Sequence, residues 1–523
     1  MIIPVKCLLF ICFLAVMAFF LSFLLNLLIF LLSAILIAYV YFTWHFGHWK
    51  KKNIPFIPPV PVLGNFGSWA MLRTDIGGMF REIYHKAKGN ESGLVGIWVF
   101  RKPALVVTSP EMIKAILVKD FNHFADRSAQ ADKEYDPLGA DNLFFGKNPH
   151  WKLMRVKLTH LFSSAKMKNM FGLMNEIGKD LETCIAEHGS DPVEVRDTCA
   201  RFTTDVIATT AYGLKANALL DRQAPFNVFR KKLLDFRWFR SVEFMSIFFM
   251  QGFAKWRKCK VFETELADWM RTVFWKTVTE RERTKEVRND LIGTLIALRD
   301  QTQEGDEIRF DGDSLVAQSA IFFTAGNESS STTMSLLLYH LALCPDIQEK
   351  LATEIIETLN KSDGEVTYEN LQEMAYLEMC VKEILRLFPP LPFLDRECTV
   401  PYHVPGTNLT IERGTYVYVP VMGIQTDAQY FPDPLAFRPE RFDKENGDEI
   451  TPFTFFPFGE GPRNCIGERY GMLQSRLGLI RILRRFRVEK CSKTQEPIVW
   501  QALSLSPTAK DGIFLRFIIL SRF

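Results

Sequence analysis

A segment near the C-terminal end of the chain is built to present one cysteine. Residues 458–467 read FGEGPRNCIG, so Cys465 lies between glycines that bend the chain. An iron held by one thiolate, rather than by histidine, receives electron density from the sulfur that favours cleavage of an O–O bond. The alternative is a buried loop cysteine that performs no chemistry.

The residues around Cys465 fit a metal ligand. Arg463 can pair with a carboxylate of a cofactor, Phe458 can cover the sulfur, and Gly461 permits close backbone approach. Apolar residues then recur at spacings of three and four, which predicts a helix that begins at Cys465 and lowers the pKa of the thiol. These apolar positions are Ile466, Tyr470, Leu473, Leu477, Ile480 and Leu483.

The elements that must position this segment belong to a large, mainly helical body. The chain has 523 residues, 48% of them apolar and 24% charged, and its net charge of +3 does not indicate nucleic-acid binding. Its ten cysteines include no CxxC pair, so zinc ribbons and disulfide frameworks are not expected. Helical patterns dominate residues 112–388, and β-like runs occur at 94–100, 104–108, 399–404 and 415–420. The prediction is a mainly α fold with small β-sheets.

An apolar segment at the N-terminus is long enough to span a bilayer. Residues 7–44 carry no charge, and a cleaved signal peptide would have a much shorter apolar region. Lys6 precedes the segment and three lysines follow at 50–52, which predicts that the body faces the cytosol. We therefore expect a membrane anchor at 1–44, a basic and proline-rich linker at 45–65, and a catalytic domain at 66–523.

Four segments together resemble the cytochrome P450 monooxygenases. Residues 458–467 resemble the haem-thiolate loop, and 383–386 (EILR) resemble the Glu-x-x-Arg helix. Residues 437–442 (FRPERF) resemble the segment whose arginine completes a buried charge network with that helix, and 325–330 (AGNESS) resemble the oxygen groove. The resemblance covers about residues 55–523 and implies a cytochrome P450 fold with an N-terminal transmembrane helix. It is nearest to microsomal, insect xenobiotic-metabolising members.

The resemblance implies haem b (iron protoporphyrin IX) as cofactor, with Cys465 as the iron ligand. In the family, a Trp-x-x-x-Arg helix and further arginines hold the haem propionates. A solvated loop arginine is the alternative for Arg127. The residues that match these positions are Trp151, Arg155, Arg396, Arg127 and Arg463.

A long helix predicted at 313–343 carries the oxygen groove. The resemblance implies that Ala325 leaves room for O₂, while Glu328 and Ser329 relay protons. Ser329 replaces the family's usual threonine, so its hydroxyl lacks the methyl that fixes the rotamer, and we expect more leakage to hydrogen peroxide. The alternative for Ser329 is a hydroxyl bonded back to its own helix. Asn327 has no explanation in the sequence.

The activity that the resemblance implies is insertion of one oxygen atom of O₂ into lipophilic small molecules at the endoplasmic reticulum membrane. Electrons would come from NADPH through a separate NADPH-cytochrome P450 reductase, with cytochrome b5 as a further candidate partner. Lys152, Arg155, Arg469 and Arg476 would attract the reductase. Metabolism of insect hormones and breakdown of synthetic insecticides are both compatible roles. The alternatives are a haem-thiolate isomerase or dehydratase that needs no reductase, and a non-catalytic protein that binds lipophiles.

Overall fold

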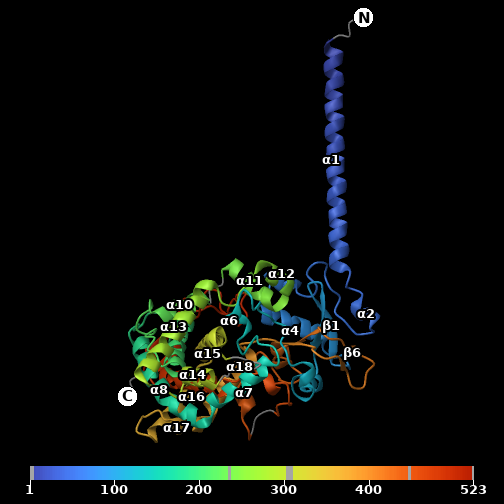
Figure 1. Ribbon diagram of the computed structural model, residues 1–523. Coiled ribbons are helices and arrows are strands. Elements are labelled where there is room, and N and C mark those ends of the chain that lie inside the picture. The colour runs from blue at the N-terminus through green and yellow to red at the C-terminus, as the bar shows by residue number, and fades with distance from the viewer. Residues whose placement is uncertain (1–4, 234–236, 302–309, 446–448, 521–523) are drawn as a thin grey trace.

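One helix stands apart from the rest of the molecule. The computed structural model describes residues 5–233, 237–301, 310–445 and 449–520. In it, α1 (Val5–Thr43) projects from a compact body (Figure 1). At 39 residues and 1.5 Å per residue it is about 58 Å long, and its Leu9–Thr43 stretch is the one apolar helix of membrane-spanning length among the described residues. The structure does not describe residues 1–4 or the side chain of Lys6. Lys6 is one of the charges from which the orientation was predicted.

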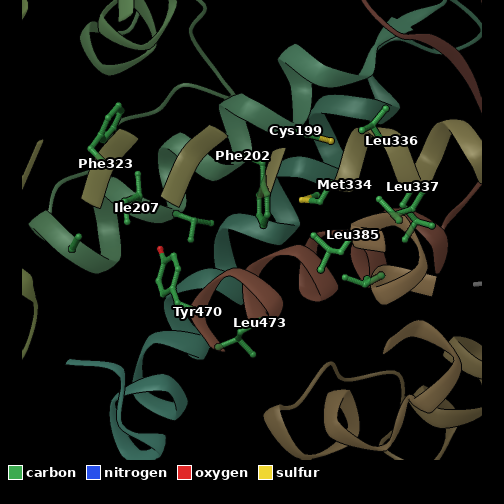
Figure 2. Close-up of a cluster of buried hydrophobic side chains, with 14 of the residues drawn as sticks. Cys199, Phe202, Ile207, Phe323, Met334, Leu336, Leu337, Leu385, Tyr470 and Leu473 are labelled. Carbon is green, nitrogen blue, oxygen red and sulfur yellow. The ribbon is translucent and has the colours of Figure 1, made fainter. Parts of the chain in front are cut away.

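The body is mainly helical, as predicted, and three helices form its centre. These are α9 (Val195–Ile207), α15 (Gly312–Leu343) and α20 (Glu468–Leu483), which pack together through buried apolar side chains (Figure 2). The remaining helices are α2 (His48–Lys51), α3 (Gly67–Ala70), α4 (Ile76–Ala87), α5 (Pro110–Lys114), α6 (Pro137–Ala140), α7 (His150–Thr159), α8 (Ser164–Ala186), α10 (Pro225–Leu233), α11 (Trp238–Phe249), α12 (Gln251–Arg257), α13 (Thr264–Thr284), α14 (Leu291–Gln301), α16 (Pro345–Asn360), α17 (Tyr368–Glu373), α18 (Ala375–Leu387) and α19 (Val421–Gln425). Short 3₁₀ or π turns are η1 (Ala115–Lys119), η2 (Phe121–His123), η3 (His160–Phe162), η4 (Ala208–Tyr212), η5 (Pro439–Phe442) and η6 (Gly461–Arg463).

The prediction for the helix after the cysteine was wrong by three residues. α20 begins at Glu468, because Cys465 donates its backbone N–H to the Phe458 carbonyl at 2.8 Å and the chain then turns at Gly467. Cys465 therefore sits in a loop ahead of the helix. The prediction for the long helix at 313–343 is confirmed, since α15 begins one residue earlier and ends at the same position.

Three small sheets flank the helices. A four-stranded sheet has the order β1-β2-β7-β4, a three-stranded sheet has the order β3-β9-β8, and β5 pairs with β6. β2 is antiparallel to β1 and parallel to β7. The strands are β1 (Leu94–Val99), β2 (Lys102–Val107), β3 (Val193–Glu194), β4 (Leu394–Glu397), β5 (Tyr402–His403), β6 (Thr410–Ile411), β7 (Tyr416–Val419), β8 (Phe486–Lys490) and β9 (Phe514–Ile519). All four predicted runs overlap a strand, whereas β3, β4, β6, β8 and β9 were missed.

A buried charge network braces the side of the body that carries α18. Glu383 accepts two hydrogen bonds from Arg386, at 2.7 and 2.8 Å, and one from Arg441 at 3.2 Å. All three side chains are almost fully buried. Burial of charges is tolerated only when they are paired and hydrogen-bonded, so this network ties α18 to η5.

Candidate active site

A cavity of about 410 Å³ lies inside the body, and Cys465 forms part of its wall. The cavity also meets α7, α9, α11 and α15, and most of its lining side chains are apolar. Cys465 and Ala325 lie deep in the fold, yet both have exposed surface because they face this cavity. A thiol and a small helical residue from separate elements therefore share one internal space.

The backbone around Cys465 is fixed from two sides. Arg155 on α7 donates to the Asn464 carbonyl at 2.7 Å and to its side-chain oxygen at 2.8 Å. Gly461 has a φ of +72°, and a Cβ there would lie 1.9 Å from the Leu117 carbonyl. Gly461 was expected to contact the cofactor, but it does not line the cavity. Its role is to let the loop pack against η1.

The pKa of the Cys465 thiol is raised, to about 11, rather than lowered as the sequence predicted. Burial raises it, and the Gly467 N–H and the charges of Arg155 and Arg127 oppose burial only in part. The helix that was expected to stabilise the thiolate begins three residues later. A coordinated metal ion would remove the proton outright, because a coordinating thiol is deprotonated.

One end of the site concentrates buried positive charge. Arg463 stacks on the Trp151 ring, with 4.2 Å between its guanidinium carbon and the ring centroid, and donates to the Gly146 carbonyl at 2.6 Å. Arg127 is 7% exposed and pairs with Asp395 at 2.8 Å, so the alternative of a solvated loop arginine is wrong. Arg396 is fully buried on β4 and donates to the Asp395 carbonyl.

Two acids face these three arginines: Asp395 pairs with Arg127 at 2.8 Å, and Asp126 lies 3.5 Å from Arg463. Burial raises the pKa of Asp395, but the Arg127 charge, the Ala129 N–H and Arg396 outweigh that effect and hold it at about 2. Burial and the neighbouring Arg127 charge lower the pKa of Arg396 to about 9. The Nε atoms of Arg396 and Arg463 are buried without a hydrogen-bond partner in the described part of the chain. This end of the site therefore suits an anionic group.

The predicted propionate partners do not all reach the cavity. Trp151, Arg155, Arg127 and Arg463 line it, as does Phe458. Arg396 does not, since its side chain is 1% exposed and donates to the Asp395 carbonyl.

The α15 face of the cavity carries the groove residues. Gly326, Glu328 and Ser329 line it beside Ala325. Ser329 donates to the Ala325 carbonyl at 2.7 Å, which is the back-bonded arrangement considered as the alternative. Its oxygen still has free lone pairs, and Glu328 is ion-paired with Arg196 of α9.

Asn327 faces away from the cavity and ties α15 to α9. Its amide nitrogen donates to the Ala200 carbonyl at 3.0 Å and to the Thr204 hydroxyl at 2.7 Å. The Thr203 hydroxyl in turn donates to the Asn327 carbonyl at 3.2 Å. The unusual polar residue is therefore explained by helix packing.

The four cations expected to attract the reductase differ in accessibility. Lys152 and Arg469 are exposed. Arg155 is half-buried and bonded to Asn464. Arg476 is 4% exposed and donates to the Leu371 carbonyl, so the expectation that it offers surface charge was wrong. It lies on the inner face of α20, which the sequence periodicity alone does not distinguish.

Two parts of the cavity wall were not predicted. Residues 503–506 of the C-terminal loop line it, and so do Phe244 and Phe248 of α11. α11 belongs partly to the core and partly to the surface, since Phe248 is buried while Trp238 is 56% exposed. No local pattern marks the 503–506 loop, because only the three-stranded sheet brings it to the cavity.

The residues present fit a haem. The described residues contain no cluster of three or more His, Cys, Asp or Glu side chains that could hold a metal ion alone. A single thiol, an apolar wall and a surplus of buried arginines instead match an iron that arrives in an apolar ring with carboxylate arms.

Comparison with known proteins gives a family match over most of the chain. The model of the family described as "Cytochrome P450" matches residues 55–513. "Cytochrome P450 6k1" of Blattella germanica is 40% identical, over 94% of this chain and 96% of the relative. "Probable cytochrome P450 6g2" of Drosophila melanogaster is 38% identical over 94% and 98%, and "Probable cytochrome P450 6a13" of the same species is 37% identical over 95% and 100%.

Proposed function

The chain belongs to the cytochrome P450 family and is a haem-dependent monooxygenase, and from this premise we propose that it oxidises lipophilic small molecules at the endoplasmic reticulum with electrons from a separate NADPH-cytochrome P450 reductase. Cytochrome b5 is a second candidate donor. In this proposal residues 1–44 are the anchor, 45–65 the linker and 66–523 the catalytic domain. The observation that carries it is the shared cavity of Cys465, Ala325 and the arginine-rich end.

We assign the haem contacts as follows. Cys465 supplies the thiolate, Phe458 covers it, and Arg155 keeps its loop in place through Asn464. Arg127 and Arg463 bind the carboxylate arms, while Trp151 packs under Arg463. Arg396 does not line the cavity, but it shares the charge of Asp395 with Arg127. The bound haem supplies the activation of O₂ and its transfer to substrate.

The residues of α15 that line the cavity would bind O₂ beside the haem and supply protons. Ala325 and Gly326 present no side chain beyond a methyl, so they leave space for a diatomic molecule. Glu328 and Ser329 both line the cavity, so the carboxylate can accept and release a proton and the Ser329 hydroxyl can pass it on.

The reductase binding site is assigned to the face that carries Lys152 and Arg469. Both are exposed cations, one on α7 beside the Cys465 loop and one on α20. Electrostatic complementarity with an acidic partner speeds association and depends on salt. Charge reversal at Lys152 and Arg469 together should raise the KM for reductase, and more so at low ionic strength.

Membrane attachment is supported by two surfaces. α1 is apolar and stands clear of the body. α11 and α12 lie on the side of the body from which α1 emerges (Figure 1), and they expose Trp238, Phe239 and Trp256. We propose that α1 spans the membrane with the body in the cytosol, and that these rings rest on its surface. Glycosylation of sequons such as Asn90 in microsomes would contradict this orientation.

The cavity sets the substrate class. Its wall is apolar apart from the haem contacts and a few hydroxyl and charged groups, so we propose lipophilic substrates. Insect hormones and synthetic insecticides both fit this description.

The decisive experiment is the absorption spectrum of the reduced carbon monoxide complex. We expect the strongly red-shifted Soret band of thiolate ligation in the wild type and its loss in Cys465→His. Oxidation of a panel of lipophiles should then depend on both NADPH and reductase. Turnover without reductase would favour the isomerase or dehydratase, and ligand binding without any turnover would favour the lipophile-binding protein.

A further inference from the structure

One buried glutamine joins the helix after Cys465 to the oxygen groove. Gln474 on α20 is fully buried, and its amide nitrogen donates to the Gly326 carbonyl at 2.6 Å and to the Ser330 hydroxyl at 2.5 Å. Gly326 lines the cavity between the groove alanine and the proton-relay residues. A side chain from α20 therefore holds the backbone of α15 at the groove.

The packing of α20 against α15 makes this contact possible. Gly471 and Gly478 lie one turn before and one turn after Gln474, on the same face of α20. A Cβ at Gly478 would lie 2.3 Å from Met334 and 2.8 Å from Phe202, so only glycine permits this approach. Figure 2 shows these two side chains between the central helices. Gly478 thereby lets α20 pack closely on its neighbours, so that one amide can reach across to α15.

The orientation of the Gln474 amide is fixed by its partner. A carbonyl oxygen accepts hydrogen bonds but cannot donate, so the nitrogen must face Gly326. This leaves the amide oxygen of Gln474 buried and without a partner in the described part of the chain.

Gln474 is unusual among the buried glutamines for this reason. The other three among the described residues each donate to two carbonyls and also accept from a backbone N–H: Gln318 from Leu143, Gln348 from Val488, and Gln425 from Phe456. A buried acceptor without a partner destabilises the fold, so a residue retained in this state calls for a role other than stability.

The geometry at Gly326 indicates that role. In an α-helix the Gly326 carbonyl already faces the N–H of the next turn, and a second donor from outside draws such a carbonyl away from the helix axis. The following residue, Asn327, is held from the other side by Ala200 and Thr204 of α9. The peptide unit between residues 326 and 327 is thus fixed by two neighbouring helices.

We propose that Gln474 is a positioning residue that sets the shape of the oxygen groove by holding the Gly326 carbonyl and the Ser330 hydroxyl. The inference rests on the proposed function, since it assigns Gln474 to the same haem site. It couples α20, the helix that follows Cys465, to α15, the helix that carries the groove. It predicts that loss of the amide changes the geometry of the groove but leaves the stability of the fold nearly unchanged.

The test compares Gln474→Met with Gln348→Met. Methionine has nearly the same length and shape but cannot hydrogen-bond in this way. Gln474→Met removes an unpaired buried oxygen, so its melting temperature should change little. Its reduced carbon monoxide complex should show a shifted C–O stretching band, and a several-fold larger share of electrons should be lost as hydrogen peroxide. Gln348→Met loses three satisfied hydrogen bonds outside the cavity, two to Val488 of β8 and one to Leu341 at the C-terminal end of α15, so it should melt earlier with an unchanged C–O band.

An unchanged C–O band in Gln474→Met, with or without a lower melting temperature, overturns the inference. If the methionine variant does not accumulate, Gln474→Glu takes its place, because it keeps the side-chain length but replaces the donating nitrogen with an acceptor. The same C–O band and peroxide share are then measured. A wild-type protein without the thiolate-type carbon monoxide spectrum would contradict the proposed function itself, so the two failures are distinguishable.

Discussion

Arg196 at the start of α9 is ion-paired with Glu328 in the middle of α15. Both side chains are largely buried, and the second carboxylate oxygen of Glu328 has no partner in the described part of the chain. Arg196 also donates to Thr508 at 3.4 Å, and that hydroxyl bonds to Ser504 on the cavity wall. The acid of the proposed proton relay is thus held in place by a residue outside the cavity.

This pairing predicts non-additive effects of mutation. Glu328→Gln should lower product formation roughly 100-fold, since a positioned acid or base contributes at least that much to proton transfer. Arg196→Gln should lower it less, and the double variant should resemble Glu328→Gln, because Arg196 acts only through the carboxylate. Product and NADPH consumption are measured together. Multiplicative losses in the double variant would show that Arg196 has a separate role.

Ser329→Thr should lower the share of electrons lost as hydrogen peroxide, and Ser329→Ala should raise it. The added methyl of threonine restricts the side-chain rotamer and thereby fixes the hydroxyl that now bonds to Ala325. Ser335→Ala is the matched control, because that hydroxyl bonds to its own helix but does not line the cavity. Equal partitioning between product and peroxide in wild type and Ser329→Thr would refute this view of the hydroxyl.

Much of this site could be predicted because its signals are local. The glycines around Cys465, and the residue pattern that predicts α15, can each be recognised within one continuous stretch of sequence. The start of α20 was misplaced because the periodicity continues through the turn at Gly467, where backbone bonds to the preceding loop override it.

The unpredicted parts depend on distant contacts. Residues 503–506 reach the cavity only because β9 pairs with β3 and β8. Arg476 looks like a surface cation in the sequence but is buried under Leu371 and Met374. Gln474 belongs to no motif identified in the sequence. Its proposed role can be inferred only from its hydrogen bond to the Gly326 carbonyl in the structure.

The buried network of α18 should be far more sensitive to mutation than a surface pair. Glu383→Gln removes the carboxylate that pairs with the buried Arg386 and also contacts Arg441, which should destabilise the fold by about 3–5 kcal/mol and reduce the yield of haem-loaded protein. Glu176→Gln removes the exposed pair with Lys179 on α8 and should cost about 0–1 kcal/mol. Chemical denaturation of both variants provides the comparison, and similar losses would mean that the network does not brace the fold.

His340 should make the fold sensitive to acid. Burial lowers its pKa to about 4, from an ordinary value of 6.5, and its ring lies near Phe388 and Phe437. Between these two pH values the unfolded chain binds a proton that the folded chain does not, so stability falls as pH decreases through this window and is unaffected above it. The loss should approach about 3 kcal/mol at pH 4. In His340→Leu the melting temperature should fall less steeply from pH 7 to pH 4 than in the wild type, whereas the exposed His403→Leu should follow the wild-type curve. Parallel curves for wild type and His340→Leu would show that this histidine does not set the acid limit.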